Sequence, residues 1–386
     1  MTVITGQLNG FEVEYITDDA AFLKAVTKLS QAQDLALDLE FDDNRYTYGL
    51  NLCLIQIADR ETCYLIDPFA VKELQPLWEI IQNPDIVKII HSSSNDIILL
   101  KTLGCVPQNV LDTELAAKVL DYGRTSFANL MAVIFNIEID KAYQVSNWNT
   151  RPLSEEQLLY AANDVVYLHA LKDHLLDRIK ALGREDWLWE ECRLLEQIEQ
   201  KSQADRYQKL RGAERLTYFE LFILKQLYYF REELAQDLDK PAGSVIPNEV
   251  LINLAVQPAG NFNEWQNTKG LMGRIKDNNT FKQYRRVVQE ANEQAKAEGI
   301  PLTRPVRPRH PDFLVSKEEA ERRKTLLQPV RSYIITMYGE NVAGLILPQG
   351  VINDFAEGRP LEIRKKYAQK IVADVMAELI ITLPIV

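Results

Sequence analysis

The hydrophobic pattern of this 386-residue chain changes character once, and that change limits the architectures open to it. Up to about residue 180, short apolar or alternating runs typical of strands mix with segments of helical periodicity. From about Arg184 onward only helical patterns remain. The pattern therefore predicts an α/β or α+β domain built on one mixed sheet flanked by helices, followed by all-helical domains.

The pattern also places the elements of the first half. The last predicted helix opens with Ser154 and Gln157, an S-x-x-Q capping box that satisfies free backbone N–H groups at a helix start. Strands are expected at residues 11–16, 34–41, 52–58, 63–67 and 87–91. Helices are expected at residues 20–33, 94–103, 113–121, 126–135 and 154–179.

A stretch rich in Pro and Arg divides the helical half. Residues 300–311 read IPLTRPVRPRHP, a composition typical of an extended linker. The order of long helix, short helices and long helix occurs on both sides of it, which predicts two helical domains. The helices are expected at residues 216–237, 247–256, 263–268, 278–297, 317–337 and 360–381, with a turn at Gly339 and Gly344 and a short helix after Pro348.

The charge of the chain is acidic and uneven. The formal net charge is −11, and residues 1–180 hold 26 of the 55 acidic residues but only 14 of the 44 basic ones. Such a charge is a poor match for a phosphate-rich partner unless some carboxylates converge as ligands.

The composition excludes two further classes of protein. No apolar run reaches the ~20 residues of a membrane helix, so no membrane partner is expected. The four cysteines lack the spacing of a zinc site or a disulfide framework, so we expect reduced thiols in a cytoplasmic protein. They are Cys53, Cys63, Cys105 and Cys192.

Two carboxylates interrupt an otherwise apolar strand pattern. Asp38 and Glu40 lie two apart in LALDLEF, so they project from the same face of the strand. Two charges among residues that favour burial need a partner, and a divalent cation is the natural one. The alternative is an edge strand whose polar face meets water.

Two more acidic positions complete a candidate metal site. Asp96 follows a predicted strand at the start of a helix, where it could also act as a cap. Tyr160 and Asp164 are four apart and share one face of their helix. Four such carboxylates could surround two divalent ions, Mg²⁺ or Mn²⁺, in the arrangement that clamps a phosphoryl group for in-line attack.

The segments LALDLEF, KIIHSSSNDIILL and LLYAANDVVYL resemble the three exonuclease motifs of ribonuclease D, a family of four-carboxylate 3′→5′ exonucleases. The resemblance implies a ribonuclease H-like exonuclease fold. It also implies that Asp38, Glu40, Asp96 and Asp164 bind the metals and that Tyr160 orients the attacking water. Tyr160 matches the Tyr subclass, because Leu159 stands where the sister subclass has His.

The segment RLTYFELFILKQLYYFREELAQDLDKPAGSVIPNEVLINLA resembles the HRDC module, a helical domain that follows the exonuclease domain in ribonuclease D. The expected domains are the exonuclease domain (1–180), a helical connector (181–210), the HRDC domain (211–297), a linker (298–314) and a second, degenerate HRDC-like domain (315–386).

The resemblance implies a 3′→5′ exoribonuclease that releases nucleoside 5′-monophosphates and trims tRNA precursors and other stable RNAs. RNA is then the main partner, with single-stranded DNA as an alternative. One rival reading is a DNA-directed exonuclease of repair or recombination, and another is a non-catalytic nucleic-acid-binding scaffold. The segment before the last motif is expected to border the active site and bind substrate, through Lys141, Gln144, Trp148 and Arg151.

Other polar residues near the motifs have simpler explanations. His91 is expected to bond a loop backbone, and Asp112 to cap the helix that begins at Thr113. Asp42 and Asp43, where family members often carry basic residues, are expected to be solvated or to offer a further metal contact.

Overall fold

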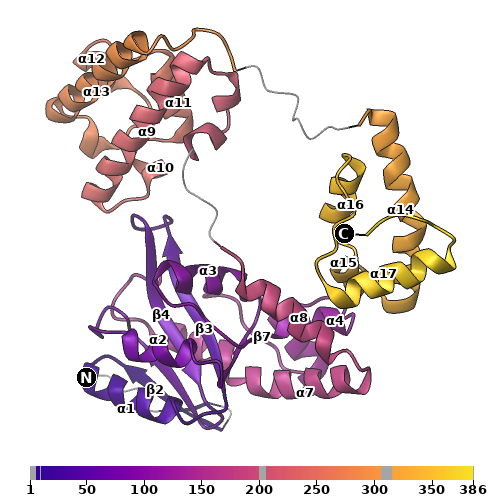
Figure 1. The fold of residues 1–386 in the computed structure, drawn as a ribbon. Helices are drawn as coiled ribbons and strands as arrows, with labels where there is room; N and C mark the ends of the chain where they lie inside the picture. Colours follow the sequence, from indigo (N-terminus) through magenta and orange to yellow (C-terminus); the bar gives the residue numbers. More distant parts are fainter. Residues whose placement is uncertain (1–5, 9, 200–205, 306–314, 386) are drawn as a thin grey trace.

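The computed structural model describes residues 6–8, 10–199, 206–305 and 315–385. In these residues a mixed seven-stranded sheet has the order β1-β2-β5-β4-β3-β6-β7 (Figure 1). The pairs β2–β5, β3–β6 and β6–β7 are parallel, and the other neighbours are antiparallel. The strands are β1 (Gly6–Leu8), β2 (Phe11–Ile16), β3 (Asp34–Asp43), β4 (Leu50–Ala58), β5 (Thr62–Ile66), β6 (Val87–Ile90) and β7 (Val110–Asp112).

The mixed sheet flanked by helices confirms the predicted fold class. All five predicted strands are present, with ends shifted by at most two residues. The prediction missed β1 and β7, because a strand of three residues is too short to show alternation.

Alternating side chains of β3 enter two different cores. Leu35 and Leu37 are buried with the helices on one face, whereas Ala36 is buried with those on the other. Asp38 and Glu40 continue the Ala36 side of the strand, as the two-residue period requires. The Leu35 face is covered by α1 (Asp19–Leu29), α2 (Gln75–Ile81) and α3 (Ser94–Thr102). The Ala36 face is covered by α4 (Thr113–Val119), α6 (Glu155–Val166) and α7 (Leu168–Ala181).

The helix predicted at 154–179 is two helices, α6 and α7, which meet at Tyr167. The apolar period continues across the junction, so the sequence does not mark it. The capping box predicted at Ser154 and Gln157 is present. Ala161 and Ala162 are buried against the sheet, which brings α6 close to β3 and β4.

A further helix, α8 (Glu185–Glu196), covers the free edge of β7. The Val110 N–H donates to Glu196 Oε1 at 2.7 Å, and the Asp112 N–H faces Cys192 Sγ at 3.5 Å. An unpaired strand edge invites association with other chains, and these side chains occupy its donors. Residues 185–196, expected in a connector, therefore pack as part of the sheet domain.

The two helical regions have separate cores. The first, which we call helical unit 1, spans residues 206–305 and centres on the stacked rings of Trp265 and Tyr284. It contains α9 (Tyr218–Leu238), α10 (Ala242–Val245), α11 (Asn248–Val256), α12 (Phe262–Asn267) and α13 (Asn278–Ala297). The second, helical unit 2, spans residues 315–385 and contains α14 (Lys317–Tyr338), α15 (Glu340–Ile346), α16 (Gln349–Ala356) and α17 (Lys366–Glu378).

Two details of helical unit 2 differ from the prediction. Gly344 lies inside α15, because Gly339 alone makes the turn with a φ of +95°. The last helix begins at Lys366 instead of residue 360, because residues before it are extended and Leu361 bridges to Ile385. Short helical segments elsewhere are α5 (Phe127–Leu130), a π-helix (Met131–Phe135) and 3₁₀ turns at Arg206–Lys209, Ala213–Arg215 and Gly273–Ile275.

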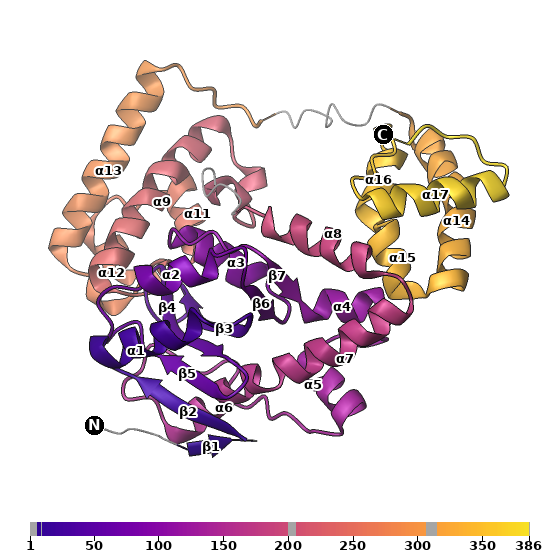
Figure 2. The same ribbon diagram turned by 60° about the horizontal axis from the view of Figure 1, so that its bottom comes forward.

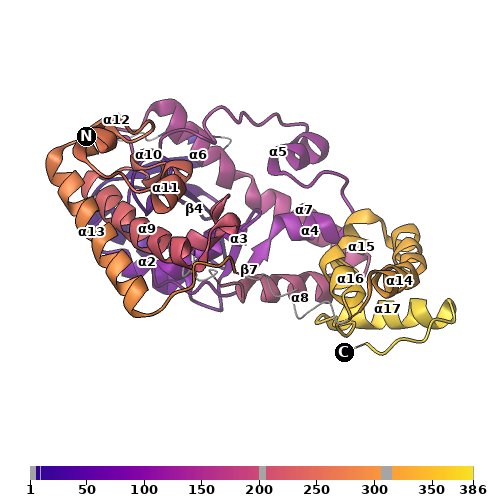
Figure 3. The same cartoon turned by 90° about the horizontal axis from the view of Figure 1, so that it is seen from above.

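Figures 2 and 3 show the helical units at opposite ends of the sheet domain. Helical unit 1 meets the β3–β4 hairpin, where the Tyr48 N–H donates to Asp239 Oδ1 at 3.2 Å. Helical unit 2 meets α4 and α8, where Trp187 stacks on Tyr367 with ring centroids 4.9 Å apart. None of the described helices combines the length and the hydropathy needed to cross a bilayer.

We predict that Glu196→Ala lowers the free energy of unfolding by about 1–2 kcal/mol, because the buried Val110 N–H loses its acceptor. Glu196→Gln keeps an acceptor oxygen and should cost less than half as much. Urea unfolding of both variants tests this, and equal losses would contradict the role of the hydrogen bond.

Candidate active site

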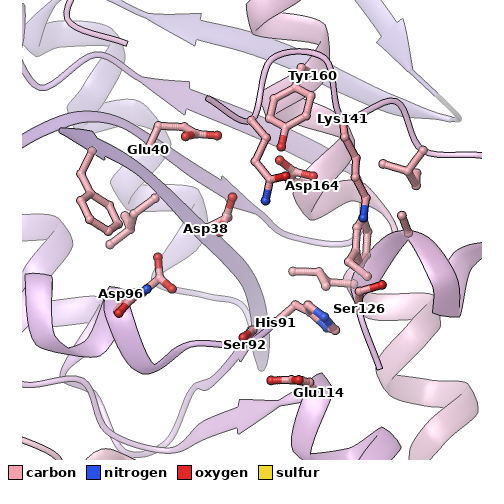
Figure 4. Close-up of a pocket in the computed structure, with 18 residues that line it drawn as sticks. Asp38, Glu40, His91, Ser92, Asp96, Glu114, Ser126, Lys141, Tyr160 and Asp164 are labelled. Atoms are coloured by element: carbon pink, nitrogen blue, oxygen red, sulfur yellow. The ribbon is translucent and has the colours of Figure 1, made fainter. Parts of the chain in front are cut away.

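A pocket of about 450 Å³ opens where β3, the start of α3, the start of α4 and α6 meet. Four carboxylates and one tyrosine from the predicted motifs line it (Figure 4). They are Asp38 and Glu40 on β3, Asp96 on α3, and Tyr160 and Asp164 on α6. The motif residues thus converge on one pocket, although they are up to 126 positions apart in the chain.

Three of the carboxylates lie close together, and the fourth lies apart from them in the same pocket. Asp38, Glu40 and Asp164 each offer an oxygen within 4.8 Å of the others. Asp96 lies on the other side of Asp38 in Figure 4 and is 6% exposed. Among the described residues, the group of three is close enough to share one metal ion.

Local structure explains how each element delivers its carboxylate. The pairing of β3 with β4 shifts register between Glu40 and Phe41, so the strand bends just after the two acids. Ser93 precedes α3, and Asp96 stands in the first helical turn, pointing into the pocket. The small Ala161 and Ala162 let α6 lie close enough to the sheet for Asp164 to reach Asp38.

Burial and mutual repulsion disfavour the charged forms of these acids. Burial raises the pKa of Asp38 to about 7. Burial together with the charge of Asp38 raises the pKa of Asp164 to about 8. The same two causes raise the pKa of Asp96 well above its ordinary value, and for Glu40 the charges of Asp38, Asp164 and Asp96 add to burial. Such a set is stabilised by a cation that neutralises it.

Tyr160 lies beside this group, and two aromatic rings pack against its own ring. Its ring centroid is 6.0 Å from that of Trp148 and 6.4 Å from that of Tyr143. Burial and the charges of Asp164, Glu40 and Asp38 raise the pKa of Tyr160 far above its ordinary value. The hydroxyl therefore keeps its proton and can donate a hydrogen bond, including to Asp164.

Of the four residues predicted to border the substrate, two line the pocket and two lie outside it. Lys141 and Gln144 are exposed and line the pocket rim. Trp148 is 3% exposed and lies behind Tyr160, outside the pocket lining. Arg151 also lies outside it: its guanidinium donates to both oxygens of Asp67, at 2.6 and 2.9 Å, and to nearby carbonyls.

Sequence reasoning missed the far end of the pocket. That end is lined by His91, Ser92, Glu114 and Ser126. His91 Nδ1 pairs with the Thr113 hydroxyl at 2.9 Å, and the ring also bonds the backbone of Thr125, which lies in a loop as predicted. Glu114 gave no signal beyond its place directly after the helix start.

Two other aspartates have structural roles. Asp112 caps α4 as predicted, accepting from the N–H groups of Glu114 and Leu115. Asp42 was expected to be solvated or metal-binding, but it is 4% exposed and organises the β3–β4 hairpin. Its carboxylate accepts from backbone N–H groups of residues 45–47, from the Thr47 hydroxyl and from Asn149 Nδ2.

The pocket suits hard divalent cations. With Asp96 included, its motif carboxylates come from β3, α3 and α6, and carboxylate oxygens are the ligands that Mg²⁺ and Mn²⁺ prefer. The raised pKa values give the same indication, because a bound cation would offset the repulsion that causes part of them.

Known proteins share this fold and these segments. A family model described as 3'-5' exonuclease matches residues 13–180. Ribonuclease D of Zymomonas mobilis is 32% identical over 292 residues, which cover 74% of each protein. Ribonuclease D of Desulfotalea psychrophila is 37% identical over 238 residues, which cover 60% of this chain and 63% of the length of that relative.

The solved structure of Escherichia coli RNase D is similar over 95% of this chain and 99% of that chain. Its TM-score is 0.67 at 23% identity, so this likeness supports the fold. The identity to the Zymomonas protein over three quarters of its length supports common descent as well. The chain belongs to the ribonuclease D family.

Proposed function

We propose that this protein is a 3′→5′ exoribonuclease that hydrolyses the terminal phosphodiester bond of RNA and releases nucleoside 5′-monophosphates. The observation that carries the proposal is the convergence of Asp38, Glu40 and Asp164 within 4.8 Å, with Asp96 and Tyr160 in the same pocket. A scaffold without catalysis gains nothing from these partly buried, mutually repelling acids, whose desolvation is costly.

In this proposal Asp38, Glu40, Asp96 and Asp164 hold two divalent ions, Mg²⁺ or Mn²⁺. Two such ions would supply an activated water and charge stabilisation at the phosphoryl group. The carboxylates fix where that chemistry occurs, and their placement on a strand and two helices makes the site rigid.

The neighbouring residues would orient the substrate. The Tyr160 hydroxyl, which keeps its proton, would donate a hydrogen bond that orients the attacking water. Lys141 and Gln144 on the rim would contact the RNA backbone, which positions a substrate without reading its sequence. Trp148 and Arg151 would act indirectly, by holding Tyr160 and the segment that carries the rim residues.

The natural substrates would be the 3′ ends of tRNA precursors and other stable RNAs. The Escherichia coli relative is an exoribonuclease involved in structured RNA processing. We further propose that residues 211–297 form an HRDC domain and 315–386 a degenerate second one, joined through 298–314, and that they hold the RNA body. The proposal includes a cytoplasmic location, where the four buried thiols would stay reduced.

An exonuclease assay tests this function. A 5′-labelled tRNA precursor with a 3′ tail and a matched single-stranded DNA are incubated with Mg²⁺, Mn²⁺ or EDTA. We expect stepwise shortening of the RNA from its 3′ end, release of 5′-monophosphates, and no reaction in EDTA. Absence of metal-dependent shortening would overturn the enzyme proposal, and shortening of DNA alone would favour the DNA-directed alternative.

Two substitutions separate metal binding from orientation of the water. Asp38→Asn should lower kcat by at least about 10³-fold while RNA binding persists, because one metal ligand is lost. Tyr160→Phe should lower kcat by about 10²-fold with little change in KM, because only a hydrogen bond in the transition state is lost. Glu138→Gln, on an acid outside the pocket lining, is the matched control. Wild-type rates in Asp38→Asn would refute the assigned site.

The electrostatics of the pocket also predict an effect on stability. Because the pKa values of Asp38 and Asp164 are raised on folding, these acids stabilise the fold at pH below about 4 and lose that contribution as pH rises through 7–8. In EDTA the melting temperature should therefore fall between pH 6 and 8.5, and Asp38→Asn should reduce that fall. Mn²⁺ should raise the melting temperature more at pH 8.5 than at pH 6, and an equal rise at both would contradict this account.

A further inference from the structure

The short helix α4 connects the pocket with helical unit 2. Its first turn carries Glu114, which lines the pocket. Just past its last residue, Asp121 and Tyr122 contact α15. A helix of seven residues is about 10 Å long. Because its backbone is hydrogen-bonded throughout, a displacement of its C-terminal end also displaces its N-terminal end.

At the pocket end, the residue that caps α4 also fixes the start of α3. One oxygen of the buried Asp112 carboxylate accepts from the N–H and the hydroxyl of Ser93, at 2.7 and 2.8 Å. Its other oxygen accepts from the N–H groups of Ser92 and Glu114. Ser93 directly precedes α3, whose first turn carries Asp96. The position of Asp96 therefore depends on where α4 begins.

At the far end, the sheet domain caps a helix of helical unit 2. Gly339 precedes α15 and has no side chain to cap it. Asp121 supplies the missing acceptor: its Oδ1 accepts from the Asn341 N–H at 2.8 Å, and Asn341 Nδ2 donates to the Tyr122 carbonyl at 2.6 Å. A Cβ at position 339 would lie 1.7 Å from Asp121 Oδ2, so glycine is required by the contact as well as by its φ of +95°.

Buried polar contacts around this cap make the interface specific. Glu191 on α8 is 7% exposed and accepts from Lys365 Nζ at 2.8 Å and from the Tyr367 hydroxyl. Arg184 donates to the Val119 carbonyl at the end of α4 and lies over the ring of Trp187. Glu191 would lose both of these partners if helical unit 2 moved away, which disfavours separation.

We propose that helical unit 2 acts as a positioning element for the active site: by docking on Asp121 and Tyr122 it fixes α4, and through Asp112 and Ser93 it fixes Asp96. This inference rests on the metal-binding role given to Asp96 in the proposed function. Asp112, Asp121 and Asn341 are then positioning residues, because none of them lines the pocket.

The test uses the full-length protein and two readouts that do not need RNA to reach helical unit 2. Mn²⁺ binding is measured by calorimetry without substrate. Turnover is measured with a p-nitrophenyl ester of a nucleoside 5′-monophosphate, which is small enough to occupy the pocket alone. The variants are Asp121→Ala, which removes the cap, Asp121→Asn, which keeps an acceptor oxygen, and Asn341→Ala, which removes only the bond to Tyr122.

We expect Asp121→Ala to weaken Mn²⁺ binding and lower turnover of the small ester by about threefold to tenfold each. Asp121→Asn should restore most of both, and Asn341→Ala should show a smaller loss. Asn353→Ala, in the same helical unit but on an exposed turn of α16, should match the wild type. If Asp121→Ala does not fold, Asn341→Ala carries the test.

Unchanged Mn²⁺ binding and ester turnover in folded Asp121→Ala and Asn341→Ala would overturn the inference, even if RNA degradation falls. Asp38→Asn distinguishes this failure from failure of the proposed function. If Asp38→Asn loses Mn²⁺ binding and turnover while the interface variants match the wild type, the inference alone fails. If Asp38→Asn keeps both Mn²⁺ binding and ester turnover, the proposed function fails together with the inference.

Discussion

The repulsion among partly buried carboxylates on one side of β3 is the constraint on which the arrangement of this protein depends. Asp38, Glu40 and Asp164 lie within 4.8 Å of one another in surroundings that raise their pKa values. A chain that only needed a stable sheet would place apolar residues there, as it does at Leu35 and Leu37 on the opposite face. The folding energy lost at the pocket must therefore come from elsewhere, and two large apolar cores on either side of the sheet are its source.

The sequence made the centre of this site predictable because its residues obey strict periods. Asp38 and Glu40 share a face because a strand alternates with a period of two, and Tyr160 and Asp164 share a face because a helix turns once in 3.6 residues. Neither periodicity predicts which strand or helix packs against which other element. The convergence of β3, α3 and α6 followed from the resemblance to ribonuclease D, and the structure supplies its geometry.

What could not be predicted depends on contacts between distant segments. Glu114 reaches the pocket only because β7 pairs beside β6, and β7 is too short to be seen in the sequence. Asp42 looks like a surface residue, yet it is buried because the hairpin folds its backbone donors around it. Gly344 was read as a turn, but it lies within α15, whose residues Ala343 and Ile346 are buried in the core of helical unit 2. In each case long-range packing overrode the local preference of the residue.

The packing of α8 against the edge of β7 determines where the chain can be truncated. The family model for the exonuclease domain ends at residue 180, which would suggest a natural place to cut. A fragment ending there would lose Cys192 and Glu196 and would leave the N–H groups of Val110 and Asp112 on an open strand edge. Such edges recruit strands from neighbouring molecules and promote aggregation. A fragment of this chain that resists aggregation should therefore extend through α8, and the boundary of the family model lies inside the folded unit.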